Sequence, residues 1–441
     1  MPVNHMDIPA APLDLVSLAL KSVSDQKLTL RIEIAGRIDT QQMQTALSLT
    51  LVHHPILGYQ LYTHTGWPTW QHATDKAAHI SLLVINAPDQ HAMPDFCMLD
   101  QAEHTPIAVR IMRGTQDDTL YITVDHTVAD MAGTKEIAYT LAAYYSQLER
   151  GIRPRPLQQP PPPRGLKEVC AEISSFRKLM AVCKWRAVRG RWHFPTGDTD
   201  NNSESTYMIR NLSAKSISHL KAYCKPHAAT INDILIAALF SSLHDLHECT
   251  PGERLPVQFT IDLRRHLWPG RQAQVANLSS SAHVWLKKNP EECFVQTLRR
   301  THRVLTDIKK NYPGIGAAII LELVFKLGSQ RTEKAMRRLF RESLATSMGN
   351  PLLINTGVID DIRLNFGSAK IRNACLLGPS LLVPGLTITA SGYRDQLTLG
   401  AGFNRARTRP DYIAHILDDM IGYLPEPCWP ITTTAQSSTI V

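Results

Sequence analysis

At residues 119–150 an alternating strand runs through a turn of small residues directly into a long helix, and this stretch constrains the fold most. Leu120, Ile122 and Val124 alternate with polar neighbours, which is the period of a half-buried strand. A helical spacing of apolar residues follows after only a few positions. His126 lies at the mouth of the strand, where the backbone is fixed on both sides and the imidazole can face a cleft.

The rest of the chain mixes strands and helices without a strict alternation of the two. Strands are predicted at 28–36, 58–63, 79–85, 106–113, 207–212, 256–263, 281–286, 352–358, 385–391 and 396–402. Helices are predicted after the N-cap residues Asp39 and Thr230, and at 290–311, 315–345 and 409–424. We therefore expect an α+β fold, in the form of an α/β sandwich.

A cluster of prolines divides the chain. Residues 151–164 include Pro154, Pro156 and an uninterrupted run at 160–163, which is typical of a stiff, extended connector. A chain of 441 residues is also too long for a single core. We expect an N-terminal half at 1–164, a crossover at 165–205 and a C-terminal half at 206–441. The alternative is a loop that lies on the surface of one domain.

Charge and composition limit the classes of function. The formal net charge of +8 fits an anionic partner, such as a nucleotide-bearing thioester, an acidic carrier protein or nucleic acid. We expect no nucleic acid, because zinc-finger spacing and aromatic-basic motifs are absent from the sequence. The eight cysteines include no CxxC pair, so no metal site is expected. The sequence has no run of about 20 apolar residues, which predicts no membrane association and a cytoplasmic protein.

The spacing His-x-x-x-Asp occurs three times, and local context separates the three cases. His91 lies in a stretch rich in loop-forming residues, and His415 lies in the middle of a predicted helix. Only His126 lies where a strand meets a loop of small residues that leave room for a substrate. The pairs that begin at His91 and His415 are explained as surface features, whereas His126 and Asp130 indicate a functional site.

At these residues the chain resembles a family. The segment Asp125-His126-Thr127-Val128-Ala129-Asp130 is similar to the His-x-x-x-Asp motif of the thioester-dependent acyltransferases, which include chloramphenicol acetyltransferase, plant alcohol acyltransferases, polyketide-associated acyltransferases of mycobacteria and condensation domains of peptide synthetases. Further short resemblances follow in the family's order, at His53-His54-Pro55-Ile56-Leu57, Asn232-Asp233-Ile234-Leu235, Asp262-Leu263-Arg264-Arg265, Ala276-Asn277-Leu278-Ser279, Ile354-Asn355-Thr356-Gly357 and Asn365-Phe366-Gly367.

The resemblance implies two chloramphenicol acetyltransferase-like subdomains, arranged as a V-shaped pseudo-dimer with a central tunnel. The acyl thioester would enter from one face and the acceptor from the other, with the catalytic histidine between them. Two neighbours of His126 depart from the family's pattern. Asp125 stands where condensation domains have the first of two histidines, and Met131 stands where a glycine usually follows the motif aspartate, with Gly133 two positions later. Both are expected to lie beside the tunnel.

The resemblance also assigns roles to residues. His126 is expected to act as general base, since a neutral imidazole can take a proton from an attacking alcohol or amine. Asp130 is expected to orient the loop by pairing with Arg264, a role compatible with a helix cap. Asp262 and Gly133 are expected to support this arrangement. Candidate donors to the oxyanion are Asn355, Thr389 and Ser391.

We therefore expect a monomeric acyltransferase or free-standing condensation enzyme that forms an ester or an amide. Its donor would be acyl-CoA or acyl-phosphopantetheine on a carrier protein in trans, and its acceptor a small alcohol or amine. The alternative is an inactive relative that binds a carrier or an acyl ligand. Basic residues in the helical region 299–341 would dock an acidic carrier or CoA phosphates, or would simply form a solvated helix face.

Overall fold

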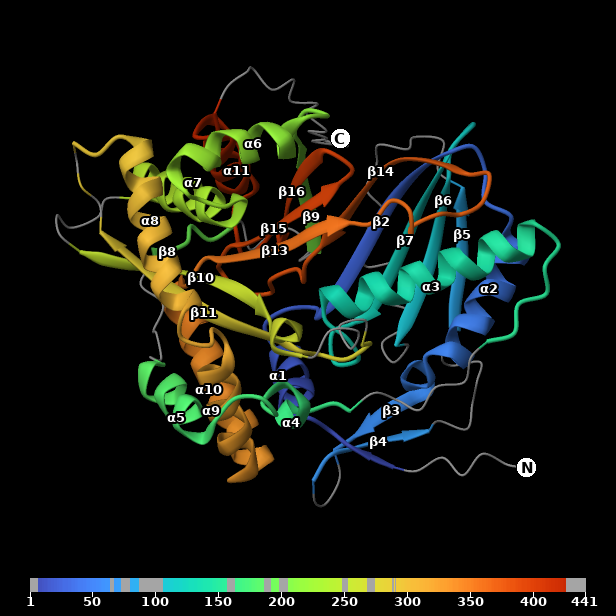
Figure 1. The fold of residues 1–441 in the computed structure, drawn as a ribbon, viewed down its shortest axis with the longest axis horizontal. Coiled ribbons are helices and arrows are strands. Elements are labelled where there is room, and N and C mark those ends of the chain that lie inside the picture. Colours follow the sequence, from blue (N-terminus) through green and yellow to red (C-terminus); the bar gives the residue numbers. More distant parts are fainter. Residues whose placement is uncertain are drawn as a thin grey trace.

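The structure is a computed structural model that describes residues 7–63, 67–72, 80–86, 106–156, 163–185, 192–197, 205–247, 253–267, 274–287, 289 and 291–425. The fold is α+β, as predicted, and it is built on two main sheets that lie side by side (Figure 1). Each sheet carries helices packed against one face, and a further group of helices lies below the junction in Figure 1.

The first sheet has the strand order β14-β2-β7-β6-β5. Four of its strands come from the N-terminal half, namely β2 (Lys27–Ala35), β5 (Ile80–Asn86), β6 (Ile107–Arg113) and β7 (Asp118–Asp125). The helices α2 (Thr40–His53) and α3 (Met131–Glu149) cover it. All these elements match the predicted ones. Asp39 caps α2 as expected, because its side chain accepts a hydrogen bond from the Gln42 amide at 2.8 Å.

The second sheet has the order β11-β10-β13-β15-β16-β9. Its strands are β9 (Ser205–Asn211), β10 (Arg254–Asp262), β11 (Ser279–Lys287), β13 (Leu352–Ile359), β15 (Thr387–Tyr393) and β16 (Gln396–Asn404). The helices of this half are α6 (Ser216–Cys224), α7 (Ile231–Leu246), α8 (Phe294–Lys309) and α11 (Pro410–Gly422). Thr230 and Asp233 form the predicted capping box that starts α7, which is buried along most of its length.

One strand joins the two halves. β14 (Lys370–Leu377) comes from the C-terminal half of the sequence, yet it pairs antiparallel with β2, with Leu376 opposite Leu30. Phe366, just before β14, is fully buried in the core of the first sheet. This strand was not predicted, and the predicted division at 165–205 would have placed it with the second sheet. The two halves are therefore joined by a strand that the C-terminal half contributes to the first sheet, as well as by the connector.

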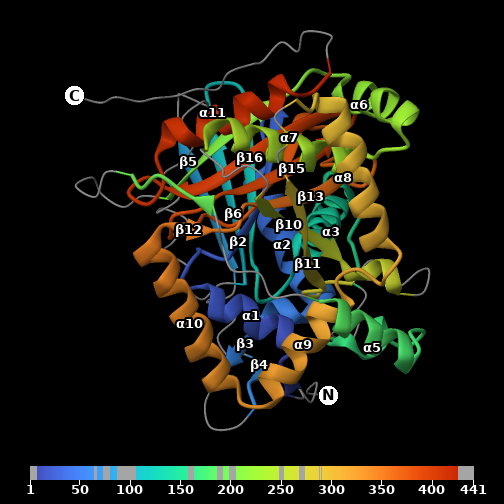
Figure 2. The ribbon, with the colours of Figure 1, turned by 90° about the vertical axis from the view of Figure 1, so that its left-hand side faces the viewer.

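Most of the remaining helices and small sheets cluster at one end of the molecule (Figure 2). The elements at this end are α1 (Pro12–Leu20), α4 (Leu166–Val169), α5 (Ser175–Lys184), α9 (Ile315–Lys326), α10 (Ser329–Thr346) and the sheet of β1 (Ile8–Pro9), β3 (Tyr59–Tyr62) and β4 (Thr69–His72). The pair β8 (Trp192–His193) and β12 (Met348–Gly349) lies beside the second sheet instead, and Trp192 is buried in the core of that sheet. Short 3₁₀ turns lie at η1 (Pro55–Gly58), η4 (Lys225–His227) and η5 (Leu263–His266).

The prediction of one helix over 315–345 is wrong. The structure has two helices there, and the break falls at Gly328, whose φ of +146° lies outside the helical region and is accessible to glycine. No helix among the described residues combines the length and apolar character needed to cross a membrane.

Because β14 completes the first sheet from the second half of the chain, we expect the two halves to unfold together. Urea unfolding followed by far-UV circular dichroism and by tryptophan fluorescence should give coincident single transitions. Two separated transitions would show that the first sheet survives without the rest of the chain.

Candidate functional site

The His126 backbone is held at the junction of the two halves. Its amide donates to the carbonyl of Gln26 at 2.8 Å, which extends the pairing of β2 and β7 by one residue. Its carbonyl accepts a hydrogen bond from the side-chain amide of Asn277 at 3.2 Å. Asn277 is buried and also donates to the Leu13 carbonyl and the Ser17 hydroxyl. The C-terminal half thus helps to fix the candidate base of the N-terminal half.

The half-buried imidazole of His126 has one nitrogen committed and one open. Nδ1 lies 3.2 Å from the carbonyl oxygen of Ala129. A carbonyl can only accept, so Nδ1 carries the proton in this bond and the lone pair lies on Nε2. Nε2 has no hydrogen-bond partner in the described part of the chain. This tautomer can accept a proton at Nε2.

Asp125, which replaces the first histidine of the condensation-domain motif, stabilises the turn. One carboxylate oxygen accepts hydrogen bonds from the Thr127 amide at 2.8 Å and the Thr127 hydroxyl at 2.6 Å. The other pairs with Lys21 at 2.7 Å. Asp125 is therefore occupied in shaping the loop around His126.

Asp130 joins the two halves through a buried ion pair, as predicted. One carboxylate oxygen accepts from the Gly133 amide at 2.9 Å and so caps α3. The other accepts from the Leu278 amide and from the Arg264 guanidinium, both at 2.7 Å. Burial alone would raise the pKa of the Asp130 carboxyl, but the charge of Arg264 and these hydrogen bonds hold it below its ordinary value of 3.8.

Arg264 reaches several groups at once. Besides Asp130, it donates to Asp262 at 3.1 Å and to the carbonyls of Gln274 and Ala276, both at 2.8 Å. Burial would lower its pKa, but the carboxylates of Asp130 and Asp262 raise it. Gly133 permits this close approach, since a Cβ there would lie 2.9 Å from Ala129 Cβ and 3.4 Å from the Ala276 carbonyl. Of the predicted supporting residues, Gly133 and Arg264 therefore contact Asp130, and Asp262 contacts Arg264.

A second buried ion pair behind the His126 loop was not predicted. Arg164 binds Asp14 in a bidentate pair, with both distances 2.8 Å, and neither side chain is more than 1% exposed. The same guanidinium donates to the carbonyls of Thr127 at 2.9 Å and Val128 at 2.8 Å, and it lies over the Trp70 ring. In the sequence, Arg164 directly follows the proline run. This position is the signal from which a structural role of Arg164 could have been predicted.

The predicted oxyanion donors lie on the strands that meet β14. Thr389 and Ser391 are buried, and their hydroxyls accept hydrogen bonds from the amides of Gly378 and Leu376, both at 3.1 Å. Asn355 is partly buried, and its side-chain oxygen accepts from the Gly357 amide at 3.0 Å. Their role toward a substrate stays a prediction.

Met131 and Thr389 are both neighbours of Gly378. A Cβ built on Gly378 would lie 2.7 Å from the Thr389 hydroxyl, 3.2 Å from Ile354 and 3.7 Å from the terminal methyl of Met131. Met131 of the N-terminal half and Thr389 of the C-terminal half therefore both approach the same glycine. The place of Met131 beside a tunnel stays a prediction.

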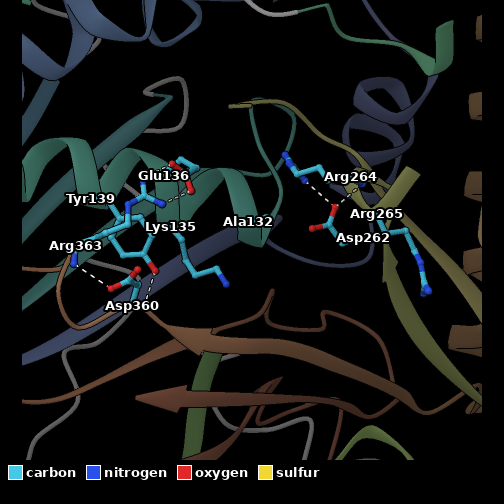
Figure 3. Close-up of a pocket in the computed structure, with 9 residues that line it drawn as sticks. All are labelled: Ala132, Lys135, Glu136, Tyr139, Asp262, Arg264, Arg265, Asp360 and Arg363. Atoms are coloured by element: carbon cyan, nitrogen blue, oxygen red, sulfur yellow. Dashed lines mark hydrogen bonds and ion pairs between the residues drawn. The ribbon is translucent and has the colours of Figure 1, made fainter. Parts of the chain in front are cut away.

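A cavity of about 400 Å³ lies beside the Asp130–Arg264 pair (Figure 3). Its lining residues come from both halves and are mostly charged, namely Ala132, Lys135, Glu136, Tyr139, Asp262, Arg264, Arg265, Asp360 and Arg363. His126 does not line this cavity, so the predicted tunnel through the active site stays a prediction.

Most cations of the cavity are already paired. Arg363 binds Glu136 at 2.6 and 2.8 Å and lies over the Tyr139 ring. Lys135 donates to the Thr356 carbonyl at 2.9 Å, and burial lowers its pKa even though carboxylates lie nearby. Arg265 is exposed and forms neither an ion pair nor a side-chain hydrogen bond with the described residues (Figure 3). It is therefore available to an anionic ligand.

The described residues contain no group of three or more His, Cys, Asp or Glu side chains placed to hold a metal ion.

Comparison with known proteins supports the fold. No protein-family model matches the sequence, and no curated protein matches it. Among solved structures, the trichothecene 15-O-acetyltransferase from Fusarium sporotrichioides has a TM-score of 0.69 at 14% identity, and the match covers 95% of this chain and 96% of that one.

Two further solved structures match at similar length. Polyketide synthase associated protein 5 from Mycobacterium tuberculosis has a TM-score of 0.65 at 16% identity, covering 94% of this chain and 98% of that one. The first condensation domain of the calcium-dependent antibiotic synthetase has a TM-score of 0.66 at 15% identity, covering 95% of each chain. The chain therefore has the two-subdomain fold that condensation domains share with this acetyltransferase.

Replacing Asp130 by Asn should cost about 3–5 kcal/mol of unfolding free energy, because Arg264 is left without its buried partner. A carboxylate with a depressed pKa stabilises the fold above the unfolded value near 3.8 and loses this contribution as the pH falls through the folded value. The acid loss of stability below about pH 4 should therefore be shallower in the variant. Urea unfolding between about pH 2 and 7 measures both effects.

The matched control is Asp262→Asn, which touches the same guanidinium from a side chain that is 51% exposed. Its cost should stay below about 1 kcal/mol. Equal costs for the two variants would contradict a special role of the buried pair.

Proposed function

We propose that the protein is a thioester-dependent acyltransferase that transfers an acyl group to an alcohol or an amine, with His126 as general base. The observation that carries the proposal is the state of the imidazole, whose Nδ1 donates to the Ala129 carbonyl and whose Nε2 has no partner among the described residues. The fold is the one found in condensation domains and in an acetyltransferase.

In this reaction the acceptor oxygen or nitrogen attacks the thioester carbonyl while its proton passes to Nε2 of His126. The tetrahedral intermediate then collapses, the carbon–sulfur bond breaks, and the imidazolium returns the proton to the leaving thiolate. The product is an ester or an amide and a free thiol. No covalent acyl-enzyme is needed, because both substrates are held together and proximity supplies much of the rate.

Asp130 takes no proton in this mechanism. Its carboxylate is buried, accepts three hydrogen bonds of which one comes from Arg264, and does not contact the imidazole. Its contribution is to fix the start of α3 and hence the loop that carries His126.

Thr389 is our preferred oxyanion donor. Its hydroxyl accepts a hydrogen bond from the Gly378 amide, which leaves the hydroxyl proton to be donated. Thr389 also shares the neighbour Gly378 with Met131, which follows the proposed base by five residues. Asn355 and Ser391 are the other candidates, and Ser391 is held in the same way by the Leu376 amide.

We assign the anionic part of the donor to the cavity beside Asp130. The phosphate of CoA or of carrier-bound phosphopantetheine would pair with Arg265, the cation of this cavity that has no partner among the described residues. A donor placed there would reach toward the His126 loop from the side of α3.

Replacing His126 by Ala should lower turnover by about 10²–10⁴-fold, which is the usual contribution of a general base. The assay is mass spectrometry of products from a mixed pool of acyl thioesters, alcohols and amines. The matched control is His415→Ala, since His415 has the same spacing to an aspartate but lies exposed on α11. Undiminished turnover of the His126 variant, with melting unchanged, would exclude the general-base role. An absence of turnover in the wild type would favour the alternative of an inactive acyl-binding relative.

Replacing Arg265 by Glu should raise KM for the donor by about tenfold or more, because a charge-assisted contact to phosphate is lost and a repulsion is added. Arg405→Glu is the control, since Arg405 is also exposed and without an ion pair among the described residues, but does not line the cavity. Measuring KM with acyl-CoA and with an acylated carrier protein at several salt concentrations identifies the donor. An unchanged KM with both donors would contradict this placement of the phosphate.

A further inference from the structure

Three helices that the proposed reaction does not use form one end of the molecule. α9 packs against both α5 and α10, and the three lie together below the second sheet in both views (Figures 1 and 2). We call these helices, over residues 175–184, 315–326 and 329–346, the basic helical end.

Most of the protein's net charge lies on this end. Its basic residues are Arg177, Lys178, Lys184, Lys326, Arg331, Lys334, Arg337, Arg338 and Arg341, and its acidic residues are Glu322, Glu333 and Glu342. Nine positive and three negative charges give +6, against +8 for the whole chain. α5 carries basic residues and no acidic ones. Arg177 and Lys184 donate to Tyr312 and Asn311 rather than to carboxylates, so their charges are not neutralised by these contacts.

The same end exposes large apolar side chains. Of the 17 described large apolar residues that are exposed, six lie in these helices and a seventh, Leu327, directly follows α9. The six are Phe176, Leu179, Met180, Leu323, Val324 and Leu344. Phe176, Leu179 and Met180 follow the spacing of one helix face and are 71%, 58% and 39% exposed. Leu327 at the end of α9 is 83% exposed.

The exposure of these apolar side chains does not result from loose packing between α5 and α9. The inner face of α5 is formed by small residues, since Ala181 is 7% exposed and a Cβ on Gly316 of α9 would lie 2.1 Å from the Ala181 carbonyl. α5 and α9 therefore already touch backbone to backbone, and the large apolar residues are on the outside of that contact.

We propose that the basic helical end docks on the surface of an anionic lipid bilayer. Basic residues would attract the headgroups, and the apolar side chains would enter the boundary between headgroups and acyl chains. A bilayer fits better than an acidic protein, because the exposed apolar residues of this end are spread over different helices, with Phe176 71% exposed on α5 and Leu327 83% exposed after α9. A deformable interface accepts such separate protrusions without a matching pocket. The protein would lie on the membrane, since none of the described helices can cross it.

The inference does not depend on acyl transfer, and its test needs no turnover. The full-length protein is sedimented with vesicles of phosphatidylcholine alone and of phosphatidylcholine with phosphatidylglycerol, at about 0.1 M and about 1 M salt, between which the Debye length falls from about 10 to about 3 Å. Binding is expected only to the anionic vesicles and should be lost at the higher salt concentration.

Variants separate this surface from general electrostatic attraction. The double change F176S/L327S should weaken binding to anionic vesicles about tenfold or more, whereas Ile152→Ser, at an apolar residue 50% exposed outside these helices, should not. The pair K334E/R341E should weaken binding, whereas R299E/R303E on exposed positions of α8 should not. Circular dichroism melting confirms that each variant folds.

Three results would overturn the proposal. The first is an absence of binding to anionic vesicles at low salt. The second is equal loss in the α8 variant and the α10 variant, which would show attraction by net charge alone. The third is binding of an acidic carrier protein that F176S/L327S abolishes while vesicles do not bind, which would make this surface a protein-docking site.

Discussion

The buried ion pair of Asp130 and Arg264 is the constraint on which the rest of the site depends. Two charges removed from water are costly, and their attraction offsets this cost only when the remaining hydrogen-bonding capacity is satisfied. Here the carboxylate also accepts from the Gly133 and Leu278 amides, and the guanidinium donates to two carbonyls. Each of these partners lies at a fixed place in one of the two halves. The pair can form only when α3, the segment before β11 and η5 have come together, so it couples the loop of His126 to the assembly of the whole domain pair.

The loop is held from a second side by Arg164 and Asp14. The carbonyls of Thr127 and Val128 accept hydrogen bonds from Arg164. The carbonyl of Ala129 accepts one from the His126 imidazole, and the carbonyl of His126 accepts one from the Asn277 side chain. Every carbonyl from residue 126 to residue 129 is therefore occupied. A loop whose carbonyls are all committed has few alternative conformations, and this is the condition under which a side chain can be presented in one orientation. The proline-rich connector ends at Arg164, so the crossover between the halves also fixes the loop.

The sequence predicted the features that depend on neighbours in the chain. Alternation located β7, the strand–loop context singled out His126, and side-chain chemistry at Asp39 and Thr230 located two helix starts. It did not locate β14 or the pair of Arg164 and Asp14. β14 pairs with a strand more than 300 residues earlier, and Arg164 lies 150 residues from Asp14. No local period marks such contacts. The Asp130–Arg264 pair, at a separation of 134 residues, was expected only because the motifs around both residues resemble those of a family.

Asp125 and Met131, the two residues that depart from the pattern of the family that the sequence resembles, both take part in local packing around the His126 loop. Asp125, in place of a histidine, is fully engaged by Lys21 and Thr127, so it stabilises the turn and has no oxygen directed at His126. The Met131 side chain reaches the neighbourhood of Gly378, where a glycine at position 131 would leave open space. Methionine is flexible and adapts to neighbouring groups, so it narrows this region without fixing a single width. Both residues therefore alter the packing around the start of α3, while Nε2 of His126 keeps no partner among the described residues.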